Sequence, residues 1–158
     1  MKLPAALIAL SVLGLGIACA EETALPQDPQ ALVDFRVGEM KAMGGALKAL
    51  SQYDANAGPM ADLADEAARV QATAAAIPSW FRVGTATGDP GVTKSRALPA
   101  IWTDWNAFAA DAKALEDVGA ALAAAVASND AAALAAAVDR TGQACQTCHK
   151  AFRAPEEH

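Results

Sequence analysis

Apolar residues recur at intervals of three and four positions along most of this chain, which is the spacing of one face of an α-helix. The pattern predicts four helices, over residues 28–53, 60–77, 98–127 and 131–153. Asp28-Pro29 offers a capping side chain followed by proline at the first helical position, and Pro78 is expected to end the second helix. Strand-like alternation is nearly absent, so the predicted fold class is all-α.

The connections between these helices predict how they are arranged. The turns between helices one and two, and between three and four at Asn129-Asp130, are short, which favours antiparallel neighbours. The connection over residues 78–97 is long and glycine-rich, and loops of this length are often functional. We therefore expect an up-down-up-down antiparallel four-helix bundle. Its core-facing stripes are expected to include Val37 and Trp105.

The first 20 residues indicate a secretory signal peptide. A basic residue precedes an uncharged stretch over residues 3–17, and small residues around Cys19 form a cleavage site. The stretch is short for a membrane span of about 20 residues. Lipidation of Cys19 is the alternative, although Gly16 three positions earlier is unfavourable. The expected mature domain, residues 21–158, is exported to the periplasm.

The charge of the chain excludes some classes of partner. It has 12 basic and 18 acidic residues, for a net charge of −6, and loss of the leader would make it one unit more negative. An acidic surface disfavours binding to nucleic acid and to anionic membranes. Neither is expected as a partner.

The most informative motif lies near the end of the chain, in Cys145-Gln146-Thr147-Cys148-His149. C-x-x-C-H is the attachment signal of a c-type haem. On a helix, Cys145, Cys148 and His149 stand at i, i+3 and i+4 and project from one face. Two thiols can then bond to one porphyrin edge while the imidazole approaches the iron.

Three other interpretations of the motif compete with haem attachment. A C-x-x-C oxidoreductase needs a strand before the motif, whereas the preceding residues are alanine-rich and helical. A structural zinc site needs four ligands, for which the only other candidates are Cys19 and His158. A disulfide between Cys145 and Cys148 within a helix would be strained.

At this point the sequence resembles the class II c-type cytochromes, the cytochrome c′ family, over essentially the whole mature chain. The specific feature is the position of C-x-x-C-H within the last helix. The ordered further matches are Phe35-Arg36, Met40-Lys41, Gly44-Gly45, Pro78 to Thr85, Ala97, Pro99, Ile101, Trp102 and Phe152-Arg153. The resemblance implies a four-helix bundle with one haem c per chain covalently attached in its core.

The resemblance also implies a set of ligands for the haem. Cys145 and Cys148 would form the thioethers, and His149 would be the proximal ligand of the iron. Arg36 corresponds to the family arginine that contacts a haem propionate. Met40, one turn later, corresponds to the position over the distal face, where it is a possible sixth ligand, with Met43 a poorer candidate.

The remaining carried-over residues concern the surroundings of the haem. Arg153 resembles the basic residue near the proximal imidazole, where a cation would favour the neutral ring. The aromatic candidates for the wall of the haem pocket are Trp80, Phe81, Trp102 and Trp105.

The function implied by the resemblance is a periplasmic electron carrier. Ligation by a methionine would make the iron suitable for electron transfer. The alternative is a haem protein with five-coordinate iron that binds NO or CO. A helical interaction module with a fortuitous motif is the third possibility. No enzyme activity is expected, the redox partner protein is unknown, and a homodimer through the first two helices is expected from the family.

Overall fold

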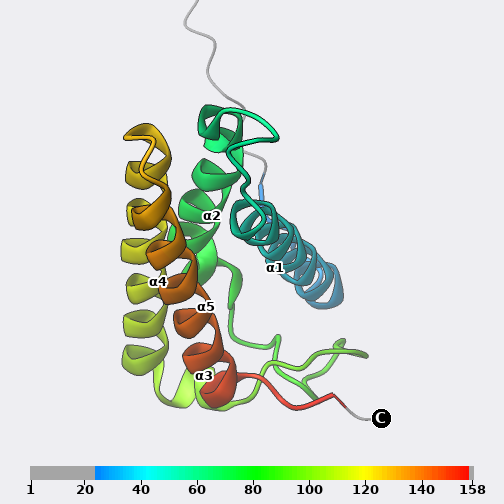
Figure 1. Ribbon diagram of the computed structural model, residues 1–158. Helices are drawn as coiled ribbons and strands as arrows, with labels where there is room; N and C mark the ends of the chain where they lie inside the picture. The colour runs from blue at the N-terminus through cyan, green and yellow to red at the C-terminus, as the bar shows by residue number, and fades with distance from the viewer. Residues whose placement is uncertain (1–23, 157–158) are drawn as a thin grey trace, which may run out of the picture.

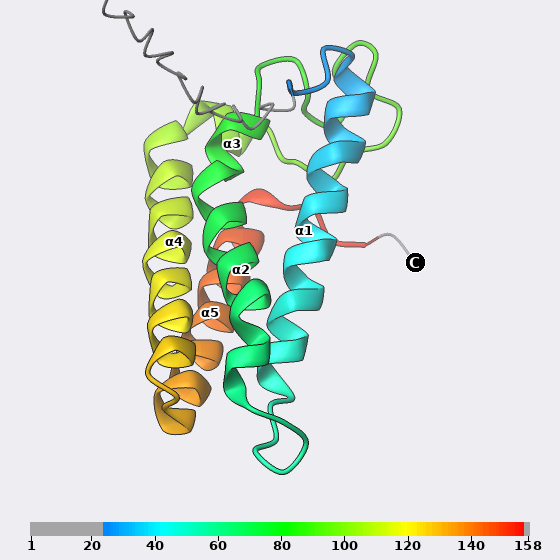
Figure 2. The same cartoon turned by 90° about the horizontal axis from the view of Figure 1, so that it is seen from above.

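Four long helices form the body of the molecule (Figures 1 and 2). The computed structural model describes residues 24–156, so the expected signal peptide and Cys19 lie outside the described residues. The elements in order are α1 (Pro29–Ser51), the 3₁₀ helix η1 (Met60–Leu63), α2 (Ala64–Ala76), the 3₁₀ helix η2 (Ile77–Trp80), α3 (Ala100–Thr103), α4 (Trp105–Ala127) and α5 (Ala131–Phe152). The predicted up-down-up-down bundle is confirmed. Among residues 24–156, no helix has the length and hydropathy needed to cross a membrane.

The helix starts follow from capping residues. Asp28 precedes Pro29 and accepts a hydrogen bond from the backbone N–H of Ala31 at 2.8 Å. Asp130 accepts one from the N–H of Ala133 at 2.9 Å and starts α5. Each side chain satisfies a backbone donor that has no partner within the helix. The predicted starts of the first and last helices are therefore confirmed.

The second predicted helix is interrupted at both ends. It begins with the 3₁₀ turn η1 and becomes α-helical only from Ala64. The α-helix ends at Ala76, just before Pro78 as predicted, but the 3₁₀ helix η2, with Pro78 at an early position, continues the helical path to Trp80. Proline is tolerated there, since the first N–H groups of a helix have no acceptor within it.

The third predicted helix is two helices, separated at Asp104. This residue has φ −129° and ψ 57°, and its side chain accepts a hydrogen bond from the N–H of Ala107 at 3.3 Å. Aspartate caps a helix better than it continues one, because its side chain competes for nearby backbone N–H groups. Trp105, expected in the core, is 39% exposed beside this break.

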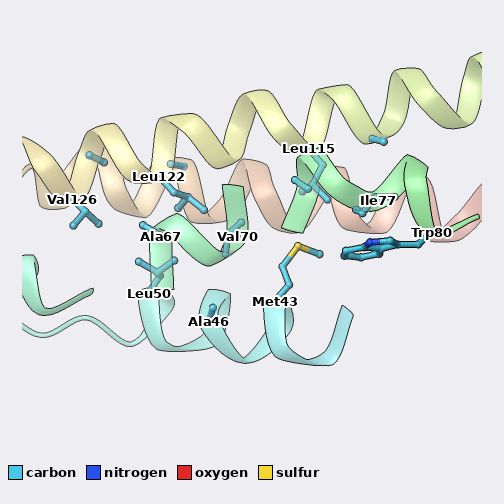
Figure 3. Packing of buried hydrophobic residues seen from close by; sticks show 14 of the residues in the cluster. Met43, Ala46, Leu50, Ala67, Val70, Ile77, Trp80, Leu115, Leu122 and Val126 are labelled. Atoms are coloured by element: carbon cyan, nitrogen blue, oxygen red, sulfur yellow. The ribbon is translucent and has the colours of Figure 1, made fainter. Parts of the chain in front are cut away.

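The buried face of the first helix is rotated by about one residue relative to the prediction. Leu32, Arg36 and Met43 are buried, whereas Val37 is 43% exposed. Figure 3 shows Met43 pointing from α1 toward the core side chains of α2 and α4. The core face of α1 thus contains an arginine, which hydropathy alone assigns to the surface.

The packing of the four helices is uneven. α2 packs extensively against α4, α4 against α5, and α1 against α2, whereas α1 touches α5 at few points. Figure 1 shows α1 diverging from α5 toward the end that carries the long loop. The α1–α5 side is therefore the least closed part of the bundle.

The long loop, residues 81–99, is fastened to α1. Gln30 accepts hydrogen bonds from the backbone N–H groups of Thr93 and Lys94, at 2.8 and 3.0 Å. Gly84 and Gly88 both have φ of 85°, a conformation that other residues rarely adopt. The loop thus has a defined path against the helix that diverges from α5.

A glycine allows α4 to approach α2 closely. A Cβ at Gly119 of α4 would lie 3.1 Å from the Cα of Gln71 in α2. We expect Gly119→Ala to lower the free energy of unfolding by about 1 kcal/mol, because overpacking exceeds the gain in helix propensity. Urea denaturation followed by circular dichroism measures the change.

Gly45→Ala in α1 is the matched control. A Cβ at Gly45 meets nothing within 4 Å. This variant is expected to gain up to about 1 kcal/mol from helix propensity alone. Equal stabilisation of the two variants would show that α2 and α4 can separate without cost.

Candidate haem-binding site

The Cys145–His149 motif occupies the last two turns of α5. Cys145, Cys148 and His149 are half-buried, and the two cysteines pack against the hydrophobic core. The two thiols are not joined by a disulfide. Because α5 is helical throughout the motif, the three side chains project from one face, as predicted.

The surroundings of the two thiols keep them protonated. Burial raises the pKa of Cys145. The pKa of Cys148 is raised to about 11, first by burial and then by the nearby charges of Asp111 and Cys145. A disulfide oxidoreductase requires the opposite, a thiol of lowered pKa, and a strand before the motif. Here the preceding segment is helix, so the oxidoreductase interpretation loses both supports.

His149 is held in the form that binds a metal. Its pKa is lowered by burial, and further by the positive charges of Arg153 and Arg96. A neutral imidazole offers a lone pair to iron, whereas a protonated ring does not. Arg153 is exposed at the end of α5, and its backbone N–H donates to the carbonyl of His149 at 3.1 Å.

A solvent-open groove of about 520 Å³ lies between α1 and α5. Gly44 of α1 and Gly142 of α5 both line it, and a Cβ at either would meet nothing within 4 Å. Met40 lies one turn before Gly44, and His149 lies two turns after Gly142. Because the two helices run antiparallel, both steps lead toward the loop end of the bundle. Met40 and His149 therefore continue the two facing sides of the groove.

The two methionines of α1 that could approach the iron have different environments. Met43 is 6% exposed and belongs to the hydrophobic core. Met40 is half-buried and lies one helical turn before Gly44, which lines the groove. Of the two, Met40 is thus the better placed to meet a group held by α5.

Arg36 is a buried cation without a carboxylate partner. It is 3% exposed, and burial lowers its pKa to about 10. Its guanidinium donates to the hydroxyl and the carbonyl of Thr85, at 2.8 and 2.7 Å, and to the hydroxyl of Ser95 at 3.2 Å. Between residues 24 and 156, no acidic group lies within ion-pair distance of it. A bound anion such as a haem propionate would supply the missing negative charge.

Aromatic rings connect Arg36 with the last helix. The guanidinium lies 4.4 Å from the ring centre of Phe81, which lies 4.8 Å from that of Phe108. Phe108 in turn contacts Phe152 of α5, with ring centres 5.4 Å apart. The Trp102 indole N–H donates to the carbonyl of Phe81 at 2.8 Å. This row of rings packs between the loop and the end of α5.

Trp80 differs from the other aromatic candidates. It is 4% exposed and packs edge-on against Phe35, with ring centres 5.6 Å apart. Figure 3 shows it beside Met43 in the core. Phe81 and Trp102 lie on the Arg36 side, whereas Trp80 lies among the core residues and Trp105 is 39% exposed.

The chemistry of the donor set fits a c-type haem. Two neutral thiols and a neutral imidazole lie on one face of α5. Gly44 and Gly142 leave the space beside them unfilled, and Arg36 is a buried cation with no anion to pair with. Zinc would need further ligands, and residues 24–156 contain no cluster of three or more histidine, cysteine or acidic residues that could hold a metal. The other zinc candidates, Cys19 and His158, lie outside the described residues.

Thr85 and Ser95 are the site residues that sequence reasoning missed. Thr85 is fully buried and Ser95 half-buried, and both accept hydrogen bonds from Arg36. Their separation from Arg36 in the sequence is 49 and 59 residues. Only the Gly84-Thr85 match to the family hinted at one of them.

Comparisons with known proteins show which family the chain resembles. The family model described as Cytochrome C' matches residues 30–153. The chain is 34% identical to cytochrome c' of Pararhodospirillum photometricum over 126 residues, covering 79% of this chain and 98% of that protein. It is 36% identical to cytochrome c-556 of Agrobacterium fabrum, covering 77% of this chain and 80% of that protein.

Solved structures show the same fold. One is the nitric oxide complex of a mutant of cytochrome c prime from Alcaligenes xylosoxidans, with a TM-score of 0.71 and 23% identity, covering 83% of this chain and 99% of that one. A carbon monoxide-bound variant of that protein matches with a TM-score of 0.70 and 24% identity, covering 82% of this chain and 98% of that one.

Proposed function

Because the chain belongs to the cytochrome c′ family, whose members carry one covalently bound haem c, we propose that it is an electron carrier with haem attached to Cys145 and Cys148. His149 would be the proximal iron ligand. A bound haem supplies a reversible one-electron centre. The observation that carries the proposal is the arrangement of the motif on one face of α5, beside the only loosely packed side of the bundle described in residues 24–156.

The residues around the motif suit electron transfer. Arg36 would bind a propionate, and its fixed position between Thr85, Ser95 and Phe81 would keep the haem in one orientation. The phenylalanine rings beside the end of α5 keep water away from that side. A rigid, partly dry surrounding lowers the cost of changing the charge on the iron, because few groups must reorient.

A second candidate function is reversible binding of NO or CO. It is favoured by the half-buried state of Met40, which packs against the core and would shield the iron without coordinating it. The solved relatives with bound NO and CO share the fold. In this alternative, Met40 is an apolar cover that admits only small ligands.

Met40→Leu separates the two functions. If the Met40 sulfur is the sixth ligand, the wild-type protein has sharp low-spin absorption bands and ignores CO. The variant then becomes high-spin and binds CO, because an iron coordination position has opened. If Met40 only covers the iron, both proteins are high-spin and both bind CO. Absorption spectra of the ferrous protein with and without CO decide between them.

Met43→Leu is the matched control for that experiment. Met43 lies in the hydrophobic core, and the exchange conserves volume. We expect its spectrum to equal that of the wild type. A low-spin spectrum that survives Met40→Leu and disappears in Met43→Leu would contradict the assignment of Met40.

We also propose that the protein functions after export to the periplasm. The support is the hydrophobic leader over residues 1–20, which lies outside the described residues, and the family membership. Removal of the leader would leave Cys145 and Cys148 as the cysteines of the mature chain.

A further inference from the structure

The segment that follows α5 is pinned to the long loop. The backbone N–H of Leu98 donates to the carbonyl of Phe152 at 3.0 Å, and the N–H of Ala154 donates to the carbonyl of Arg96 at 2.8 Å. Ala97 and Arg153 form an antiparallel bridge between these bonds. The chain after the haem motif therefore leaves α5 along a fixed path, visible as the red segment beside the loop in Figures 1 and 2.

Arg96 adds two side-chain bonds to this connection. Its Nε donates to the carbonyl of Ala154 at 2.8 Å, and its Nη1 lies 2.6 Å from a carboxylate oxygen of Glu156. The side chains of Arg96 and Glu156 are 35% and 72% exposed. A guanidinium held on two sides loses the freedom of a surface arginine, so its charge stays in one place.

This fixed charge lies close to the proximal end of the site. The pinned segment begins four residues after His149, and the Arg153 N–H bonds to the His149 carbonyl. Arg96 Nε donates to the carbonyl of Ala154, five residues after His149, so the guanidinium lies beside the end of α5 that carries His149. Arg96 comes from a distant part of the sequence, so only the folded loop brings it here.

We infer that Arg96 and Glu156 shift the reduction potential of the iron bound to His149 in opposite directions. A fixed cation disfavours the additional positive charge of ferric iron and so favours the ferrous state. Glu156 acts in the opposite direction, more weakly, because it is more exposed and solvent screens it. The inference depends on the proposed ligation by His149. Both are positioning residues that do not touch the iron.

The test compares Arg96→Gln, Glu156→Gln and the double variant, each as the haem-loaded protein, by potentiometric titration with redox mediators at low ionic strength. Arg96→Gln is expected to shift the ferric/ferrous equilibrium toward ferric about threefold, which for one electron is about 28 mV lower. Glu156→Gln is expected to shift it toward ferrous by less. The double variant should lie between the single variants.

Shifts of opposite sign in the two single variants would exclude a purely structural explanation. Both single variants break the same Arg96–Glu156 bond, so an effect through loosening of the loop would move the potential in the same direction in both. Arg96→Lys keeps the positive charge but loses the planar set of donors. It is expected to shift the potential by less than half as much as Arg96→Gln. High salt should reduce all shifts.

Lys94→Gln is the control for a change of charge on the same loop. Lys94 is exposed, and within residues 24–156 its side chain has no hydrogen bond or ion pair. Its effect on the potential is expected to be smaller than that of Arg96→Gln. Shifts of equal sign in the two single variants, or an Arg96→Gln shift no larger than that of Lys94→Gln, would overturn the inference. Absence of a haem absorption band in the wild type would instead refute the proposed function.

Discussion

A Cys145→Ala/Cys148→Ala variant is expected to contain no covalently bound haem. In the wild type both thiols stand on one face of α5 and pack at the edge of the core, where each can bond to the same porphyrin. Without them, only His149 and non-covalent contacts remain, and denaturation would release any haem. Intact mass spectrometry of the denatured protein measures the result. The wild type should carry the added mass of one haem, and the variant only that of the polypeptide.

Thr147→Ala is the matched control for the cysteine variant. Thr147 lies between the two cysteines, is exposed, and donates only to the carbonyl of Gln143 one turn earlier. It changes the same turn of α5 without removing a thiol, so haem attachment should remain at the wild-type level. Haem that survives denaturation in the double cysteine variant would contradict the attachment through these residues.

Arg36→Gln is expected to be the most destabilising of the single substitutions considered. It removes a guanidinium that makes three hydrogen bonds to Thr85 and Ser95 and lies over Phe81. Hydrogen bonds to charged donors contribute about 1.5–3 kcal/mol each, while relief from burying the charge offsets part of the loss. We expect a net decrease in the free energy of unfolding of about 2–3 kcal/mol. Urea denaturation of the haem-loaded protein measures it.

Hydrogen exchange locates the effect of Arg36→Gln. Because the lost bonds all lead to the long loop, amides around Thr85 and Ser95 should exchange faster, while those in the centre of α4 should change less. Arg36→Lys is expected to recover only part of the stability, since an ammonium cannot reproduce the planar set of donors.

The control for this prediction is Arg82→Gln. Arg82 lies in the same loop but is exposed, and its side chain donates a hydrogen bond to Gln27 at the surface. Its loss should cost less than about 1 kcal/mol. Equal losses from the two arginines would mean that burial gives Arg36 no special role.

The helices were largely predictable because their signals are local. Asp28, Asp130 and Pro29 act on backbone groups within the same turn, so their effect can be read from neighbouring residues. The same locality explains the error at Asp104. The apolar stripe continues through it, and only the competition between capping and continuation ends one helix and starts the next.

The amino-acid sequence by itself determined the all-α bundle and the face of α5 that presents Cys145, Cys148 and His149, because helical spacing places those side chains without reference to the rest of the chain. The tertiary structure decided the rest of the site. Arg36 is buried because distant Thr85 and Ser95 accept hydrogen bonds from it, and Arg96 comes close to the end of α5 because the loop pairs with the segment after that helix. Such contacts join residues far apart in the chain, and their geometry exists only once the loop has folded.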